Sequence, residues 1–270
     1  NQGAMQALDL HAHKFTPFLG GLSALELTVS PDRQSMVYTE YPTMNLWKSR
    51  LDGSERVQLT DSPAYWPRWS PDGKLIAYMD WKKIYIISAD GGVPQTIPPS
   101  DGDQVAPSWS PDGQSIYFNN FPYPGQPIKG IQVFDLATRK IAIMPGSVGY
   151  YVASWSPDGK YLVAIAQNPS RMVLYSAETK QWKDLKQFDT SWGYWVWNSD
   201  SRSIYMASTL GGNGIYQLTI PDGKWTRING MDGVTLRGLA PDSYISLTAE
   251  GQPALMSDTS VTQVYSLHWK

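Results

Sequence analysis

The chain has 270 residues, of which 41% are hydrophobic, 13% aromatic and 17% charged; it contains no Cys, and its formal net charge is −2. This composition excludes a disordered chain, a membrane-spanning helix of roughly 18 apolar residues, a disulfide framework and a basic nucleic-acid-binding surface. The excess of Trp, Tyr, Gly and Pro over charged residues indicates many short strands, tight turns and buried aromatic side chains.

The sequence of the N-terminal segment predicts two strands, but only one of them has an evident position in the fold. Residues 14–19 are expected to form an outer strand that leads into the repeats described below, whereas residues 5–10 also resemble a strand and have no evident place. The sequence begins at Asn1 without an initiator Met, and no charged segment followed by an apolar one comes after it. We therefore expect no signal peptide and interpret the sequence as a fragment or a processed product.

A turn motif then recurs along the chain. The copies are Ser30-Pro31-Asp32-Arg33, Ser70-Pro71-Asp72-Gly73, Ser110-Pro111-Asp112-Gly113, Ser156-Pro157-Asp158-Gly159 and the degraded Asn198-Ser199-Asp200-Ser201, at spacings of 40, 40, 46 and 42 residues. Ser at the first position, Pro at the second and Gly at the fourth are favoured in type I turns. Four copies directly follow a Trp, and we interpret these repeated side chains as packing residues: Trp69, Trp109, Trp155 and Trp197.

Short β-type segments follow each turn. In the second repeat they are residues 75–78 and 84–87, after which a second turn, Asp90-Gly91-Gly92, appears. With the Trp-bearing strand before the turn, each unit has four strands. Four antiparallel strands every 40–46 residues are typical of a β-propeller blade, whereas no segment has the sustained 3.6-residue periodicity of a capped helix. A two-sheet sandwich is the alternative, and the strict repeat argues against it.

The repeat count predicts a single all-β domain over residues 1–270, a six-bladed β-propeller of four-stranded antiparallel blades. The expected blades are about 22–60, 61–100, 101–145, 146–188, 189–240, and 241–270 together with 1–21. Two turns are alternatives for the opening of the last blade, Ala240-Pro241-Asp242-Ser243 and Thr248-Ala249-Glu250-Gly251, and we favour the second. Residues 244–247, 254–257 and 264–269 would then be its first three strands, and the N-terminal strand would close the ring as the fourth.

The Trp-Ser-Pro-Asp-Gly copies, each followed by a β segment headed by Lys or Gln, resemble the TolB-type, WD-repeat-like propeller family. Further segments are similar to propellers that follow a winged-helix DNA-binding domain or a Ser/Thr kinase domain in bacteria, often acidobacteria: Phe15-Thr16-Pro17-Phe18-Leu19-Gly20-Gly21, Asn45-Leu46-Trp47-Lys48-Ser49-Arg50, Asp52-Gly53-Ser54 and Val264-Tyr265-Ser266-Leu267-His268-Trp269. The resemblance covers essentially the whole chain. It implies the propeller fold, a partner domain before Asn1 and a signalling or regulatory role, but no particular ligand.

Strand direction gathers one set of loops on one face. Because the first strand of each blade ends at a Ser-Pro-Asp turn, the loops between second and third strands and between blades lie on the opposite face, around the mouth of the central channel. These loops are rich in aromatic side chains, which are enriched at contact sites but also cover blade junctions. The candidate ligand-binding residues are Tyr41, Tyr65, Trp66, Trp81, Phe121, Tyr123, Tyr150, Tyr151, Arg171, Trp192 and Tyr194.

No catalytic or metal-binding residue is expected. The three His residues lie near the termini, so a Ser or Cys nucleophile would lack its base at the channel, and no nucleophile elbow, phosphate loop or His-Glu-x-x-His motif is present. Carboxylates on the same loops keep one alternative open, a carboxylate-based glycan hydrolase or lyase, or a propeller that gates a peptidase. They are Glu40, Asp80, Asp101, Asp103 and Asp189.

The leading hypothesis is a non-enzymatic binding or sensor propeller that presents its aromatic loop face and central channel to a protein, a peptide or a small-molecule ligand. We expect no cofactor, no metal ion, no nucleic-acid binding and no membrane insertion by this domain, and we expect it to be monomeric. The resemblance to regulators favours a periplasmic or extracytoplasmic location, with the cytoplasm as the alternative.

Overall fold

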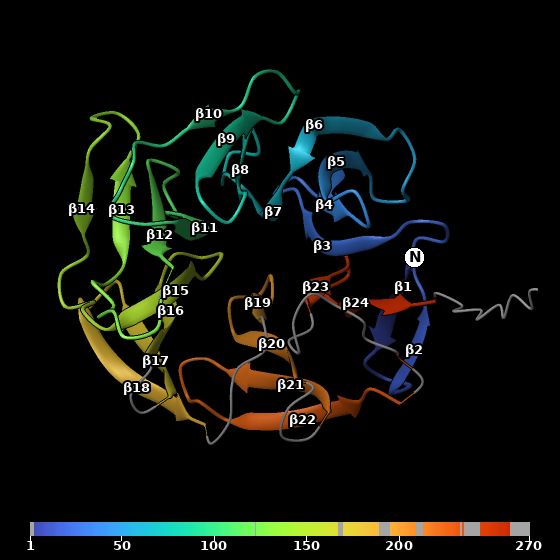
Figure 1. Cartoon of the computed structure of the whole chain (residues 1–270). Helices are drawn as coiled ribbons and strands as arrows, with labels where there is room; N and C mark the ends of the chain where they lie inside the picture. Colours follow the sequence, from blue (N-terminus) through green and yellow to red (C-terminus); the bar gives the residue numbers. More distant parts are fainter. Residues whose placement is uncertain are drawn as a thin grey trace, which may run out of the picture.

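The chain folds into a ring of six β-sheets (Figure 1). The computed structural model describes residues 3–121, 123–166, 170–188, 195–208, 213–232, 234 and 244–259. Within these residues there are 24 strands and no helix, and every sheet has four antiparallel strands. The predicted six-bladed, all-β propeller of four-stranded blades is therefore confirmed.

The first three blades are built from consecutive strands, with the first strand of each nearest the centre of the ring (Figure 1). Blade 1 contains β3 (Ala24–Val29), β4 (Ser35–Glu40), β5 (Asn45–Arg50) and β6 (Val57–Pro63). Blade 2 contains β7 (Tyr65–Trp69), β8 (Leu75–Met79), β9 (Ile84–Ser88) and β10 (Gln95–Thr96). Blade 3 contains β11 (Gln104–Trp109), β12 (Ser115–Asn120), β13 (Gln132–Asp135) and β14 (Ile141–Ile143).

Blades 4 and 5 follow the same order, and blade 6 combines both ends of the chain. Blade 4 contains β15 (Tyr150–Trp155), β16 (Tyr161–Ala166), β17 (Arg171–Ser176) and β18 (Gln181–Gln187). Blade 5 contains β19 (Trp195–Trp197), β20 (Ser203–Ser208), β21 (Gly214–Thr219) and β22 (Trp225–Gly230). Blade 6 contains, from the centre outwards, β23 (Ser246–Leu247), β24 (Pro253–Asp258), β1 (Gly3–Asp9) and β2 (Lys14–Pro17).

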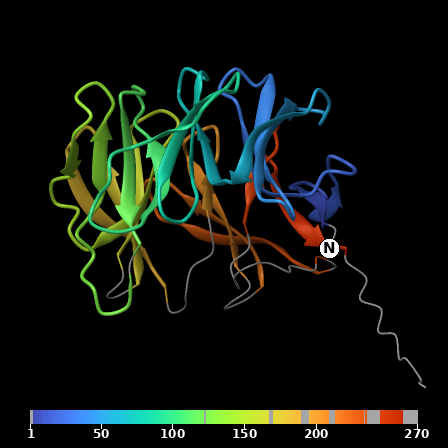
Figure 2. The same cartoon turned by 45° about the horizontal axis from the view of Figure 1, so that its top comes forward.

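Strands from both termini close the ring, as Figures 1 and 2 show where the blue β1 lies beside the red β24. β2 is the outermost strand of blade 6, as predicted. The prediction that residues 264–269 form the third strand of this blade was wrong, because β1 takes that position; residues 264–269 themselves lie outside the described residues. β1 is suited to it because Met5 and Ala7 are buried against blade 1.

The Ser-Pro-Asp turns share one hydrogen-bond pattern. In blade 2 the Ser70 hydroxyl donates to Asp72 Oδ1 at 2.6 Å, and the same oxygen accepts the Lys74 N–H at 3.1 Å. These bonds lower the pKa of Asp72, the Ser70 hydroxyl having the largest effect. Gly73 ends the turn with a φ of +72°, where glycine is favoured. The same Ser–Asp bond occurs in the turns that begin at Ser30, Ser110 and Ser156.

The two degraded turns keep this backbone geometry. The N–H groups of Ser201 and Gly251 donate to the carbonyls three residues earlier, those of Asn198 and Thr248, at 3.0 Å, and both donors have a positive φ. The Thr248 turn joins β23 to β24, so the turn we favoured does open the last blade. The alternative turn at residues 240–243 lies outside the described residues.

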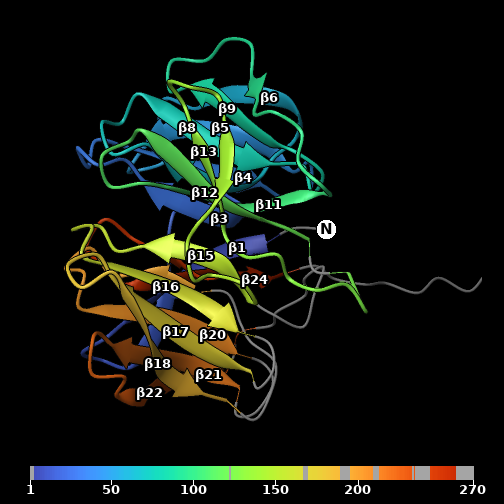
Figure 3. The same cartoon turned by 90° about the vertical axis from the view of Figure 1, so that its left-hand side faces the viewer.

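Buried apolar side chains form one cluster at each of the six junctions between neighbouring blades. At the closing junction, for example, Met256 of blade 6 lies in one cluster with Leu27 and Tyr38 of blade 1. Figure 3 shows two neighbouring blades from the side, with β11 next to β15. Because each blade buries both of its faces against its neighbours, the ring shares one distributed core.

The repeated Trp residues link the blades through hydrogen bonds as well as packing. The Nε1–H groups of Trp69, Trp109 and Trp197 donate to backbone carbonyls in the preceding blade at 3.0–3.1 Å. Trp155 differs, because no described residue accepts a hydrogen bond from its buried Nε1–H, and its ring packs edge-on against Tyr117 at 5.5 Å. The packing role predicted for these residues therefore includes a repeated bond between blades.

Candidate functional site

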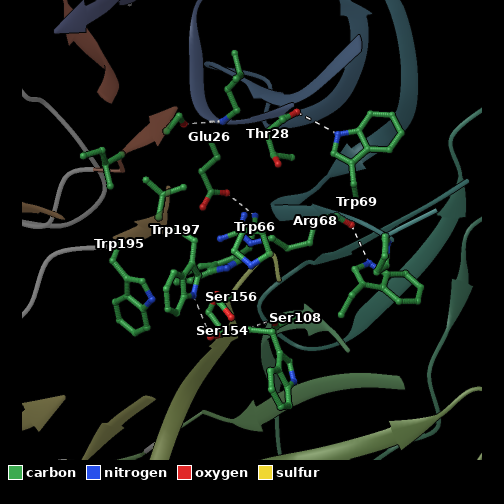
Figure 4. Close-up of a pocket in the computed structure, with 18 of the residues that line it drawn as sticks. Glu26, Thr28, Trp66, Arg68, Trp69, Ser108, Ser154, Ser156, Trp195 and Trp197 are labelled. Atoms are coloured by element: carbon green, nitrogen blue, oxygen red, sulfur yellow. Dashed lines mark hydrogen bonds between the residues drawn. The ribbon is translucent and has the colours of Figure 1, made fainter. Parts of the chain in front are cut away.

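The innermost strands of all six blades line a cavity of about 290 Å³ in the central channel. Figure 4 shows Glu26, Trp66 and Arg68 in this cavity, together with Trp and Ser side chains of the other blades. The cavity extends to Pro71, Pro111 and Pro157 of the Ser-Pro-Asp turns. The lining also includes Trp66, Trp195 and Tyr244 near the starts of the innermost strands, so the cavity runs along the channel and reaches the face of these turns.

One position of the repeat places a charged residue in this cavity. The position two residues before each turn holds a small residue in five blades and Arg68 in blade 2; the small residues are Thr28, Ser108, Ser154, Val196 and Ser246. Glu26 of β3 is the other charged residue that lines the described part of the cavity. The fold is built with small side chains at five equivalent places, so it does not itself require an arginine there.

Arg68 is a half-buried cation that forms no ion pair with any described residue. Its guanidinium lies over the Trp66 ring, 5.2 Å from the centroid, and Nη1 donates to the Pro67 carbonyl at 2.8 Å. None of the ion pairs among the described residues includes Arg68 or Glu26. Burial lowers the pKa of Arg68 to about 10, against the opposing effect of Glu26, so the group stays charged at neutral pH.

Glu26 satisfies a backbone N–H that a β-bulge takes out of the sheet. β7 has a register shift between Tyr65 and Arg68, where Trp66 has a φ of +57°, and Glu26 Oε2 accepts the Trp66 N–H. Glu26 is only 7% exposed. Burial raises the pKa of its carboxyl to about 7, although Arg68 and the Trp66 N–H favour the ionised form.

Equivalent bulges in two other blades use neutral side chains. In blade 4 the Val152 N–H donates to Asn119 Oδ1 at 2.8 Å, and in blade 3 the Ala106 N–H points to Met79 Sδ at 3.3 Å. Val152 and Ala106 have the same positive φ as Trp66, +51° and +56°. A carboxylate is therefore not needed to hold a bulge of this kind.

Of the predicted candidates, only Trp66 lines the channel cavity within the described residues. Tyr65 and Trp81 form a tilted ring pair at 5.7 Å beside the core between blades 2 and 3. Tyr150 meets Trp182 edge-on at 4.8 Å, next to the core between blades 3 and 4. These side chains take part in blade junctions.

The remaining candidates differ in their surroundings. Tyr41 and Tyr151 are partly buried against junction cores, and Arg171 pairs with Asp184 at 2.8 Å. Phe121 and Tyr123 are 40% and 45% exposed, with ring centroids 5.0 Å apart. Trp192 and Tyr194 lie outside the described residues. A role in ligand binding for these residues stays a prediction.

Sequence reasoning missed Glu26 and Arg68. Aligning the repeats on their turns would have exposed Arg68, because the same position holds Thr28, Ser108 and Ser154 in the neighbouring copies. Glu26 carries no such signal, since it contacts Trp66, its own counterpart 40 residues later in the next repeat. Only the stacking of one blade on the next brings these two residues together.

The described residues contain neither a metal-binding cluster nor a helix that could span a membrane. No group of three or more His, Asp or Glu there is arranged to hold a metal ion. Likewise, no helix within the described ranges has the length and apolar character to cross a membrane.

Comparison with known proteins places the fold. Residues 23–191, more than half of the chain, match the TolB beta propeller domain. A putative TolB from Agrobacterium tumefaciens has a similar structure, with a TM-score of 0.70 and 14% identity over 96% of this chain and 99% of that one. TolB from Acinetobacter baumannii gives a TM-score of 0.60 and 20% identity over 95% of this chain and 64% of that one.

Enzymes are also among the similar proteins. An oligogalacturonate lyase in complex with manganese has a TM-score of 0.61 and 13% identity, over 86% of this chain and 76% of that one. A 64-residue stretch is 41% identical to dipeptidyl-peptidase 5 of Porphyromonas gingivalis, which is 20% of this chain and only 9% of that protein. At these structural identities the likeness shows the fold alone, but the sequence match over residues 23–191 goes further: the chain belongs to the family of TolB β-propeller domains.

Proposed function

We propose that this propeller is a non-enzymatic binding domain whose ligand occupies the central channel. The observation that carries the proposal is Arg68, a cation that lines the channel cavity without an ion-pair partner among the described residues, at a position where other blades have small residues. Removing a charge from water without a partner costs free energy. Such a charge, set among apolar walls in a concave site, is typical of ligand recognition.

Binding suits the chemistry of this cavity better than catalysis does. The part of the lining that the structure describes carries one carboxylate, Glu26, whereas glycoside hydrolysis generally uses two carboxyl groups that flank the scissile bond. TolB proteins and an oligogalacturonate lyase share this fold, so the fold itself does not decide between the two roles. We therefore retain the binding role on the evidence of the side chains.

The wider setting is also part of the proposal. We infer that the propeller acts within a larger signalling or regulatory protein, outside the cytoplasm, and that a protein, a peptide or a small molecule reaches the channel from the Ser-Pro-Asp face. The exposed pair Phe121 and Tyr123 supports a second contact surface on the opposite loops. Immunodetection after cell fractionation tests the location, and co-fractionation with a cytoplasmic marker would contradict it.

A fragment screen by ligand-observed NMR tests the channel as the binding site. The set contains anionic, neutral and cationic fragments and is applied to the wild type and to Ser154→Phe, which fills the cavity from β15 at a residue whose side chain has no hydrogen bond in the described structure. Thr226→Phe on the exposed outer strand β22 is the matched control. We expect hits that Ser154→Phe abolishes and Thr226→Phe preserves. Hits indifferent to a folded Ser154→Phe variant would contradict the proposal.

A further inference from the structure

We propose that the channel ligand carries a carboxylate group, which binds between Arg68 and Glu26, and an apolar body that packs against the Trp residues of the channel wall. The inference rests on the proposed function, because it names the class of ligand for the same cavity. It follows from how the two charged side chains are held.

Arg68 is positioned to donate to an anion. The Pro67 carbonyl and the Trp66 ring hold its guanidinium in place, and that carbonyl takes one of its five N–H groups. The remaining donors line a cavity in which no described carboxylate pairs with them. A planar guanidinium of this kind binds a carboxylate through two parallel, charge-assisted hydrogen bonds.

Glu26 is the second partner for the ligand carboxylate, and its role depends on its protonation state. One of its oxygens accepts the Trp66 N–H, and because burial raises its pKa to about 7, the neutral acid is available near neutral pH. In that form it donates a hydrogen bond to a ligand carboxylate. The titratable groups that face it are Arg68 and Tyr65 of β7, and Tyr244, before β23, lines the same cavity.

The charges favour a monoanion over other ligands. Arg68 balances one negative charge, so a dianion such as phosphate would set its second charge against Glu26. A cation would pair with Glu26 but would stand beside Arg68 in a cavity that already holds a positive charge. The apolar part of the ligand has six Trp side chains to contact: Trp66, Trp69, Trp109, Trp155, Trp195 and Trp197.

The first test compares carboxylates with their neutral amides by titration calorimetry. Acetate, benzoate and phenylacetate are each paired with acetamide, benzamide or phenylacetamide and titrated into the wild type and Arg68→Ser. Three other blades have serine at this position, so the variant introduces a residue that the repeat already accommodates there. We expect the carboxylates to bind and Arg68→Ser to weaken them by about 10- to 100-fold, the usual size of a hydrogen bond to a charged group.

Two further variants separate charge from structure. Lys140→Ser removes an exposed positive charge between β13 and β14 of blade 3 and should leave binding unchanged. Glu26→Gln keeps an acceptor for the Trp66 N–H but does not titrate. Wild-type affinity should rise as the pH falls from 8 to 6, because a bound carboxylate favours protonated Glu26. In Glu26→Gln this pH dependence should disappear.

The outcomes also distinguish the two proposals. Amides that bind as tightly as carboxylates, or a benzylamine site that Glu26→Gln abolishes, would overturn the carboxylate inference. Binding of carboxylates that Arg68→Ser leaves intact would overturn it as well. If neutral or cationic fragments bind and Ser154→Phe removes them, the channel remains a binding site and only the ligand class is wrong. If no fragment of any charge binds, both proposals fail.

Discussion

Two bulges of the ring solve one structural problem in different ways. In blade 4, Asn119 alone satisfies the bulge: its amide oxygen accepts the Val152 N–H at 2.8 Å, and its Nδ2 donates to the Tyr150 carbonyl at 3.2 Å. In blade 2, two residues share these tasks. Glu26 accepts the Trp66 N–H, and Thr39 Oγ1 donates to the Ala64 carbonyl at 2.8 Å.

The comparison is close because the positions correspond. Thr39 and Asn119 occupy the same place in their repeats, at a distance of twice 40 residues along the chain. Blade 4 therefore shows that one neutral amide is enough, while blade 2 buries a carboxyl group beside a cation in the channel. A buried charge costs more free energy than an amide in the same role. We attribute the additional free-energy cost of the buried charges in blade 2 to a role of these charges in ligand binding.

The largest expected effect is at Asn119, the neutral side chain that satisfies the bulge of blade 4. Asn119→Ala removes the acceptor of the Val152 N–H and the donors to two carbonyls, at a side chain that is 1% exposed. We expect a loss of about 4 kcal/mol in the free energy of unfolding, measured by urea denaturation, because several buried polar groups lose their partners. Gln181→Ala, on an exposed outer strand, is the control. A loss below about 1 kcal/mol would show that the bulge does not depend on this amide.

The pH dependence of stability tests the arrangement in blade 2. Because the pKa of Glu26 is raised to about 7, the native state holds an extra proton between the unfolded pKa and this value. Its contribution to stability is then full at low pH and is lost as the pH rises through about 7. Glu26→Gln lacks this term. Its stability relative to the wild type should therefore rise by up to about 3 kcal/mol from pH 4.5 to pH 8. A constant difference across this range would contradict the account.

A double-mutant cycle tests whether the two solutions are interchangeable. At pH 5, Glu26→Ala should cost about 2 kcal/mol, because the Trp66 N–H loses its acceptor. Thr39→Asn copies the blade 4 arrangement and offers a new acceptor for the Trp66 N–H. In that background we expect the cost of Glu26→Ala to fall by about 1 kcal/mol. Additive costs would mean that the asparagine does not reach Trp66 and that the two blades are not equivalent.

The smallest expected effect concerns Arg68. If its role is to bind a ligand, Arg68→Ser should change the free energy of unfolding by no more than about 0.5 kcal/mol without ligand, or even increase it. The lost contacts are one hydrogen bond and the contact with Trp66, offset by the removal of a half-buried charge. Thermal and chemical denaturation measure this difference. A loss of several kcal/mol would instead assign Arg68 to the fold.

The local chemistry of the turns made most of the fold predictable. The Ser-Pro-Asp motif fixes where a first strand ends and a second begins, and the spacing of its copies gives the blade count. Even the degraded Thr248 turn could be chosen, because it left room for an N-terminal strand. The third strand of blade 6 was assigned to the wrong segment, since β1 has no turn motif of its own and its pairing with β24 joins opposite ends of the chain.

The candidate site was less predictable for a physical reason. Strand direction separates the two faces of the ring, but it does not show which side chains line the cavity between them. The aromatic residues predicted at the loop face include several that pack into blade junctions, such as Tyr65 and Trp81. Arg68 departs from its repeat and was visible in principle. Glu26 acts across a blade junction, which no local pattern reveals.

The most direct test of the account observes Arg68 itself. The Nε–H signal of its guanidinium, assigned by its absence in Arg68→Ser, is followed by NMR while benzoate or benzamide is added. We expect a saturable shift with benzoate, larger at pH 6 than at pH 8, and no comparable shift with benzamide. A signal that benzoate leaves in place, or that both compounds move equally, would contradict the claim that Arg68 and Glu26 form a carboxylate-binding site in the channel.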